Sequence, residues 1–142
     1  MSLARIISLA ASGLTAQRLR MQVTSANLAN METTRTVEGG PYQRRSVVFA
    51  ADPGDPTAFS SELSRAVQGV RVDSIIRDTS PPILRYLPGH PDADANGYVA
   101  YPNMSLPAEM ADLLSAVRSY EANLTVLRSA KGMWQHTLSL LG

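Results

Sequence analysis

The residues of this chain best suited to a chemical role lie together in the segment Asp92-Ala93-Asp94-Ala95-Asn96-Gly97. Their order matches the first, third, fifth and sixth positions of an EF-hand loop, in which oxygen atoms bind Ca²⁺. The twelfth position, which should supply a glutamate, is Asn103, and Pro102 beside it opposes a flanking helix. The favoured interpretation is therefore a turn whose side chains bond their own backbone. A calcium-binding module that uses the two aspartates and Asn96 is the alternative.

The other polar residues form no catalytic or ligand-binding pattern. His90 and His136 are far apart, and neither has a partner at the spacing of metal ligands. The sequence contains no phosphate-binding glycine loop, nucleophile elbow or zinc-protease signature, and it has no cysteine. A net charge of +1 gives no general attraction to nucleic acid. We therefore expect no enzymatic activity, no cofactor, no metal and no nucleic-acid partner.

Charge and proline content restrict the architecture that could position any of these residues. The 142 residues suffice for one domain, but charged side chains make up only 18% of them, below the roughly 25% usual in soluble domains. All nine prolines lie between Pro41 and Pro107, which leaves both ends free to form long helices. The longest charge-free stretch of the first half, Ile6–Gln17, is too short and polar to cross a membrane. We expect neither membrane insertion nor a cleaved secretory leader, because the helical periodicity continues past this stretch.

The C-terminal segment has the most regular pattern in the chain. Positions separated alternately by four and three residues form a seam that consists of Leu106, Met110, Leu113, Val117, Tyr120, Leu124, Leu127, Lys131, Trp134, Leu138 and Leu141. This period of about 3.5 residues predicts one helix over residues 105–142 whose narrow seam contacts a partner helix. Lys131 is the polar exception. It either fixes the register of the packing or extends its charge into solvent.

The N-terminal segment is predicted to be that partner helix. Over Leu3–Asn30, four apolar residues recur every seventh position and form one stripe: Ile7, Leu14, Met21 and Leu28. Leu9, Ala16 and Val23 form a second stripe about 200° around the helix. A helix that is apolar on two sides is buried on two sides. We expect residues 1–36 to pair with residues 105–142 through the first stripe.

The middle of the chain, residues 37–104, interrupts the helical period with clusters of proline and glycine. Short strands are expected at Tyr42–Phe49, Gly69–Arg77 and Ile83–Leu87, and a mobile loop at Ala50–Ser64. The prediction is a small, irregular β-rich insert rather than an independent core.

Motifs along the whole chain resemble one family. Ser12-Gly13-Leu14-Thr15-Ala16-Gln17, Ser25-Ala26-Asn27-Leu28-Ala29-Asn30 and Thr33-Thr34 are similar to the N-terminal signature of flagellar rod, hook and related axial proteins. Three further stretches narrow the resemblance to proximal-rod members: Glu38–Tyr42, Gly89–Val99 with Pro102-Asn103, and Ser119–Asn123. Met31-Glu32 and Trp134 depart from the usual pattern of the family.

The resemblance implies a mainly α fold, in which the long terminal helices pair as an antiparallel coiled coil within one subunit. It also implies a structural role. Subunits would stack helically into the proximal rod of the bacterial flagellar basal body, a drive shaft that crosses the periplasm and transmits torque for motility. The implied partners are further copies of the chain, the rod proteins FlgB and FlgF, the basal-body protein FliE and the flagellar type III export apparatus.

Small and amide side chains left outside the seam are the expected contacts between subunits. These candidates are Asn27, Asn30, Ser115, Ser119, Ala122 and Ser129. Small residues let neighbouring helices approach closely. Asn27 and Asn30 also lie where a helix ends and can bond its last carbonyl groups. A free-standing coiled-coil adaptor is the rival to the assembly hypothesis, although the long insert and the small-residue faces disfavour it.

Overall fold

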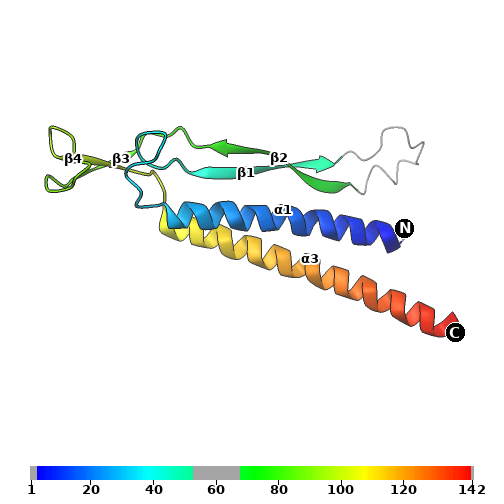
Figure 1. The fold of residues 1–142 in the computed structure, drawn as a ribbon. Coiled ribbons are helices and arrows are strands. Elements are labelled where there is room, and N and C mark those ends of the chain that lie inside the picture. Colours follow the sequence, from blue (N-terminus) through cyan, green and yellow to red (C-terminus); the bar gives the residue numbers. More distant parts are fainter. Residues whose placement is uncertain (1–2, 53–67, 142) are drawn as a thin grey trace.

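The computed structural model describes residues 3–52 and 68–141, which form an elongated molecule of two long helices and two short hairpins (Figure 1). The elements are α1 (Leu3–Ala29), β1 (Arg45–Asp52), β2 (Gly69–Arg77), β3 (Ile83–Tyr86), β4 (Tyr98–Tyr101) and α3 (Leu106–Leu141). The predicted mainly α class with a small β-rich insert is confirmed, and the insert consists of two separate two-stranded sheets.

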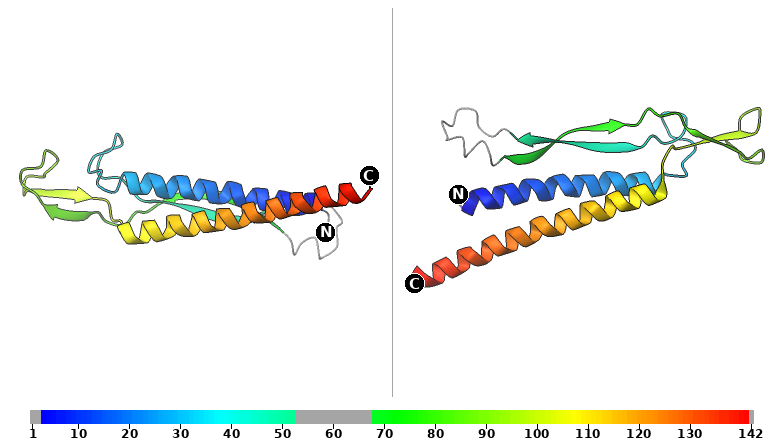
Figure 2. Two further views of the ribbon diagram at one scale, coloured as in Figure 1. Left: turned by 90° about the horizontal axis from the view of Figure 1, so that it is seen from below. Right: turned by 180° about the vertical axis from the view of Figure 1, so that it is seen from behind.

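The two helices have the predicted extents and lie side by side in opposite directions. α3 begins against the end of α1, and the two axes separate toward the chain termini (Figures 1 and 2). α3 starts directly after Ser105, and Pro107 lies in its first turn. Proline is tolerated there because it lacks an N–H, and the first amide groups of a helix have no intrahelical acceptor. The first turn also contains Glu109, which the positive end of the helix dipole favours.

The hairpin of β1 and β2 covers the side of α1 that faces away from α3 (Figure 1). Its strands pair antiparallel from Arg45↔Arg77 to Asp52↔Gly69, with a bulge between Val48 and Phe49. Ser12 on α1 anchors the far end, because its hydroxyl accepts the Val70 amide at 3.2 Å. α1 therefore lies between a hairpin and a helix, which explains why both of its sides are apolar.

The second hairpin, β3 and β4, projects beyond the helices at the end of the molecule opposite the chain termini (Figure 1). β3 matches the predicted strand Ile83–Leu87 to within one residue, whereas β4 was not predicted. The expected loop Ala50–Ser64 is partly wrong, since Ala50–Asp52 belong to β1. The remainder of that loop lies outside the described residues.

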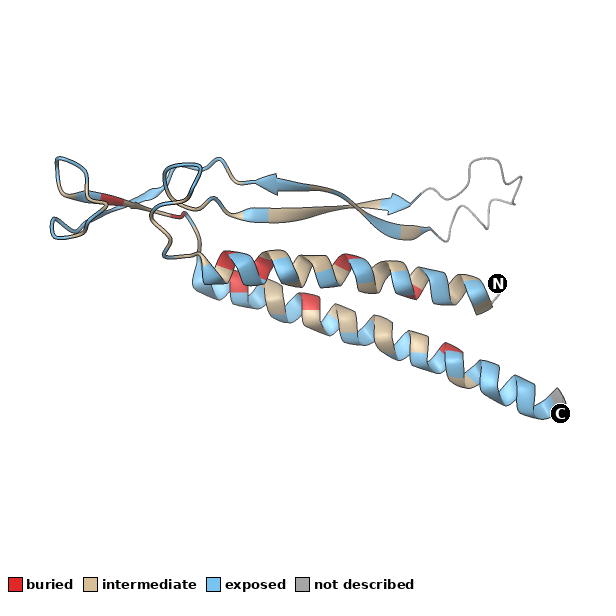
Figure 3. Cartoon of the chain, in the orientation of Figure 1, coloured by how far each residue is buried: buried red, intermediate tan, exposed pale blue. Residues whose placement is uncertain are grey.

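The interior of the subunit is made of small side chains. Within the described residues the buried residues are the apolar Ala10, Ala16, Val99, Pro102, Ala116 and Ala130 and the polar Thr24, Asn27 and Glu109 (Figure 3). Larger apolar side chains lie at the surface of both helices. Within the same residues, neither long helix has the length of uninterrupted apolar sequence that a bilayer crossing requires. One subunit thus buries little of its own apolar surface.

Candidate functional site: a polar cluster that joins three elements

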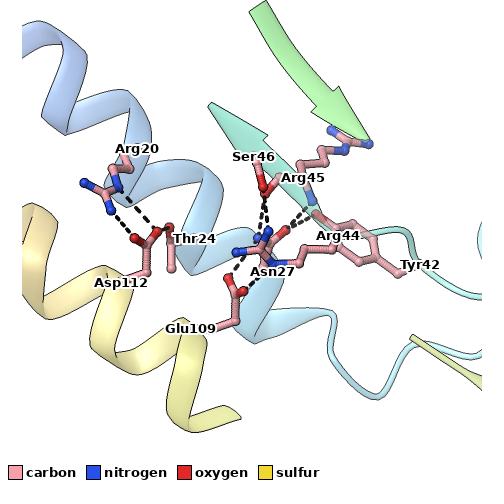
Figure 4. Close-up of polar contacts among 9 residues, drawn as sticks. All are labelled: Arg20, Thr24, Asn27, Tyr42, Arg44, Arg45, Ser46, Glu109 and Asp112. Atoms are coloured by element: carbon pink, nitrogen blue, oxygen red, sulfur yellow. Dashed lines mark hydrogen bonds and ion pairs between the residues drawn. The ribbon is translucent and has the colours of Figure 1, made fainter. Parts of the chain in front are cut away.

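Asn27, at the end of α1, is the centre of a buried polar cluster (Figure 4). Its side chain is 1% exposed. The amide nitrogen donates to the Arg45 carbonyl at 2.8 Å and to Oε2 of Glu109 at 3.0 Å. The amide oxygen accepts the Tyr42 hydroxyl and the Arg45 amide, each at 3.0 Å. All four hydrogen-bonding positions of the amide are thus occupied, and together they join α1 to β1 and α3.

Glu109 supplies the α3 side of the cluster. It is also 1% exposed, and a buried carboxylate needs charged or hydrogen-bonding partners to offset its desolvation. Arg44 donates its Nε to Oε1, while Asn27 donates to Oε2. Arg44 in turn donates to the Ser46 hydroxyl at 2.6 Å (Figure 4). The carboxylate therefore ties the first turn of α3 to the entry of β1.

Asp112, one turn further along α3, forms a second connection to α1. Its carboxylate pairs with Arg20 and accepts the Thr24 hydroxyl at 3.1 Å (Figure 4). Partial burial acts to raise the pKa of Asp112, but the hydrogen bond and charge of Arg20, together with the Thr24 hydrogen bond, outweigh it and lower the pKa. This pair aligns the two helices at a fixed axial position.

Further along, the helices meet through small residues. A Cβ placed on Gly13 of α1 would lie 2.9 Å from Nδ2 and 3.1 Å from Cγ of Asn123 on α3. Nδ2 of Asn123 also donates to the Ser119 carbonyl, which restrains the amide. The face of α3 toward α1 runs through Ala116 and Ala130, both buried. Close approach at this level depends on the absence of a side chain at position 13.

The α3 seam predicted from sequence lies beside this polar and small-residue face. Leu113, Val117, Tyr120, Leu124 and Leu127 are partly buried. Met110, Trp134 and Leu138 are 50%, 55% and 54% exposed. On α1, Leu14, Met21 and Leu28 are partly buried and Ile7 is exposed. The residues that hydrogen-bond the helices together are different ones.

The predicted subunit contacts fall into two groups. Ser115, Ala122 and Ser129 are exposed, and Ser119 is partly buried. The amide of Asn30 donates to the Ala26 carbonyl at 2.9 Å, which is the expected bond to a helix end. Asn27 requires a correction, because its amide has no free donor or acceptor to offer a neighbouring subunit. We therefore remove it from the candidate contacts.

The calcium-like segment forms a turn. Oδ1 of Asp94 accepts the amides of Asn96 and Tyr98, each at 2.8 Å, while Asp92 accepts the Thr34 hydroxyl at 2.8 Å. Gly97 supplies the left-handed conformation that the turn needs, with φ of 82°. In the part of the chain that the structure describes, no three histidine, aspartate or glutamate side chains gather as metal ligands. The interpretation as a self-bonded turn is confirmed for Asp94.

The residues that sequence reasoning missed are the partners of the cluster: Arg20, Thr24, Tyr42, Arg44, Glu109 and Asp112. One signal was available. α1 contains three arginines and no acidic residue, whereas the first turns of α3 contain the acidic residues Glu109 and Asp112. Opposite charges on two helices predicted to pair would have suggested ionic contacts near the connected ends.

Comparisons with known proteins agree with this architecture. Residues 7–35 match the family model described as flagella basal body rod protein, and residues 95–140 match the model for the C-terminal part of flagellar basal body rod FlgEFG proteins. The chain is 46% identical to the flagellar basal-body rod protein FlgC of Borreliella burgdorferi, across 99% of both chains.

Two further relatives carry the same name. The Bacillus subtilis protein is 45% identical, over 94% of this chain and 95% of its own. The Salmonella typhimurium protein is 42% identical, over 99% and 98%. The two family models cover most of α1 and α3, the helices that the polar cluster joins, and the second also covers β4. The chain belongs to the FlgC family of flagellar basal-body rod proteins.

Proposed function

We propose that the chain is a structural subunit of the proximal rod of the bacterial flagellar basal body, assembling helically with copies of itself and with other rod proteins. The observation that carries the proposal is that the buried apolar residues are small, whereas many of the large apolar residues are exposed. The buried apolar residues that the structure describes are four alanines, a valine and a proline, whereas leucine, methionine and tryptophan residues of α3 are exposed. Surfaces of this kind are usual where a protein is covered by neighbours.

Within a subunit, we propose that α1 and α3 form an antiparallel coiled coil near their connected ends. The contacts support this arrangement, because positions 27, 24 and 13 of α1 meet positions 109, 112 and 123 of α3 in reverse order. The hydrogen-bonded cluster fixes the axial register, and the partly buried leucines of the seam flank it. Torque would pass through such fixed packing rather than through any chemical step.

Between subunits, the exposed small residues of α3 are the proposed close contacts: Ser115, Ala122 and Ser129, with Ser119 beside them. Small side chains allow a neighbouring helix to approach closely. The exposed seam residues Met110, Trp134 and Leu138 would provide apolar contacts on the other side of the helix.

Membership of the rod family supports the proposed location in the rod across the periplasm and export by the flagellar type III apparatus. FlgB, FlgF and FliE remain the proposed neighbours.

A complementation experiment tests the assembly function. Cells that lack this chain should swim when it is supplied, and should stay immotile with Leu113→Asp or Leu127→Asp, because a carboxylate cannot be buried unpaired in an apolar contact. Leu127→Met is the matched control and should restore swimming, since it keeps volume and polarity. Electron microscopy of basal bodies should show missing rods in the aspartate variants. Normal swimming with both aspartate variants would contradict the proposal.

A further inference from the structure

Each end of this elongated subunit (Figure 1) carries large apolar residues that are exposed. At one end is the hairpin face, which we define as Leu84, Tyr86 and Tyr98. At the other is the tail patch, defined as Trp134 and Leu138 near the end of α3. Neither patch is covered by the described part of the chain.

The hairpin face is one side of the β3–β4 sheet. Tyr86 pairs with Tyr98 across the strands, and Leu84 lies two residues from Tyr86, so all three side chains share one side. The tyrosine rings contact edge to face with centroids 5.3 Å apart. The three side chains are 62%, 64% and 42% exposed. On the opposite side Val99 is buried, and the Arg85 guanidinium lies 4.5 Å from the centre of the Tyr101 ring.

A two-stranded sheet is marginal in water unless an apolar face is covered. One side of the hairpin is covered within the subunit, where Val99 is buried, and the other side stays exposed and is free to contact a partner. Gly97 makes this geometry possible, because a Cβ there would lie 3.0 Å from the Tyr86 ring. The turn thus holds Tyr86 and Tyr98 in a fixed position before any partner arrives.

The tail patch lies where α1 and α3 have separated (Figure 2). Trp134 and Leu138 are one helical turn apart and share a side of the helix, and both are more than half exposed. Lys131 lies one turn before Trp134 on the same side and is also exposed. After Glu121, α3 has no further acidic residue, and its charged side chains are Arg128 and Lys131.

Charge distinguishes the two patches. Asp92 pairs with Arg35 at 3.7 Å, so Asp94 is the acidic group that the hairpin end offers, whereas the second half of α3 is basic. Asp94 adjoins the hairpin face, because its Oδ1 accepts the amide of Tyr98. The hydrogen bonds from Asn96 and Tyr98 both use Oδ1, so Oδ2 can face a cation. An acidic group thus borders the hairpin face, and a basic group borders the tail patch.

We propose that the hairpin face of one copy docks on the tail patch of a second copy, with Asp94 beside Lys131. The inference rests on the proposed rod function and deepens it by naming the surfaces. Because the two patches are different and lie at opposite ends, the contact is heterologous, and it extends into an open filament unless its rotation closes a ring. It also gives Lys131 a role, that of a charged residue which selects the partner at an otherwise apolar seam.

Crosslinking tests this contact directly, because the chain has no cysteine of its own. Ala95→Cys and Gln135→Cys place one thiol beside each patch, at exposed positions outside the hairpin face and the tail patch, so that both surfaces stay intact. Purified variants would be treated with a short bifunctional maleimide. A mixture of the two single variants should give a dimer, each single variant alone should give none, and the double variant should give a ladder of multimers.

Ala111→Cys is the matched control, since Ala111 is also exposed, lies on another side of α3 and is not one of the proposed subunit contacts. Mixed with Ala95→Cys, it should give no dimer. Lys131→Glu in the Gln135→Cys chain should reduce the yield of mixed dimer at least severalfold, because it places like charges together. Dimers formed by Ala95→Cys alone, or equal yields with Gln135→Cys and Ala111→Cys, would overturn the proposal.

The same double variant in basal bodies isolated from swimming cells separates this inference from the rod function. Adducts between two copies of the chain support both. If the cells swim but the thiol introduced by Ala95→Cys crosslinks only to a different protein, or to none, the rod function stands and the self-docking contact is refuted.

Discussion

At the scale of single residues, position 27 restricts the type of side chain more than any other position in the polar cluster. A buried amide has two donors and two acceptor sites, and leaving any of them unpaired costs free energy. Here the partners come from the strand entry, the loop before it and the first turn of α3. An aspartate at this position would lose both donors and bring a second carboxylate against Glu109. The geometry therefore requires asparagine.

The first prediction concerns the loss of this amide. Asn27→Ala should lower the free energy of unfolding of the purified chain by about 2–4 kcal/mol, because Glu109 and Tyr42 lose buried partners. Denaturant titration measures the change. Gln22→Ala, at an exposed position of the same helix, is the control and should have little effect. Equal unfolding midpoints for the two variants would show that the cluster does not stabilise the subunit.

The second prediction concerns the close contact at Gly13. Alanine in a helix is favoured over glycine by about 0.5–1 kcal/mol, but here its Cβ would collide with Asn123. Gly13→Ala should thus gain less than this amount alone and recover it when combined with Asn123→Ala. Gly132→Ala is the control, because a Cβ on Gly132 would have nothing within 4 Å and the full gain is expected. If Gly13→Ala has the same effect in both backgrounds, the two side chains do not compete for space.

Sequence reasoning found Asn27 but assigned it the wrong contacts. The location of Asn27 and Asn30 at a helix end was predictable from the motif, and so was the bond from Asn30 to the Ala26 carbonyl. The hydrogen bonds of Asn27 were not predictable, because they depend on how the chain after residues 31–41 packs back against α1. A return of this kind is a tertiary property that no local spacing encodes.

At the scale of elements, α3 presents different chemistry on adjoining sides. The apolar seam is conspicuous in sequence because leucine and tyrosine dominate any periodicity analysis. The side that meets α1 contains alanine, asparagine and two acidic residues, which carry little hydrophobic signal. The length and direction of both helices were therefore predictable, while the inner face of α3 was not. β4 escaped prediction because all four of its residues, Tyr98–Tyr101, are apolar or aromatic, so no alternation with polar residues marks the strand.

The third prediction concerns the acid sensitivity of the pairing between helices. The lowered pKa of Asp112 means that the unfolded chain takes up a proton at a higher pH than the folded chain does. The contribution is present above the ordinary carboxyl range near 3.8 and is lost as the pH falls through the lower, folded value. Asp112→Asn should lower stability at neutral pH and flatten its decline in acid.

Denaturant titrations between neutral and acidic pH check this expectation. Arg20→Met should flatten the decline in part, since it removes the partner that lowers the pKa of Asp112 most, and adding it to Asp112→Asn should flatten the decline no further. An Asp112→Asn chain that retained the native slope would show that another carboxyl group controls acid unfolding.

At the scale of the whole molecule, few of the described residues are buried, and many large apolar residues stay exposed in the isolated subunit. Helices gain most of their stability from tertiary packing. The outer thirds of α1 and α3 diverge (Figure 1), and large apolar residues there, such as Ile7, Trp134 and Leu138, are exposed. The connected ends, held by the polar cluster, should be ordered in the free chain. The diverging ends should become firmly ordered only when neighbouring subunits cover them. Assembly thus completes the fold.

Hydrogen exchange of the chain, measured free at low concentration and within isolated rods, tests this account most directly. The predicted result is regional. Amides of residues 126–141 should exchange roughly tenfold or more slowly in rods than in the free chain, whereas those of 109–120 should differ much less. Equal protection of the α3 tail in both states would contradict the claim that neighbouring subunits complete this fold.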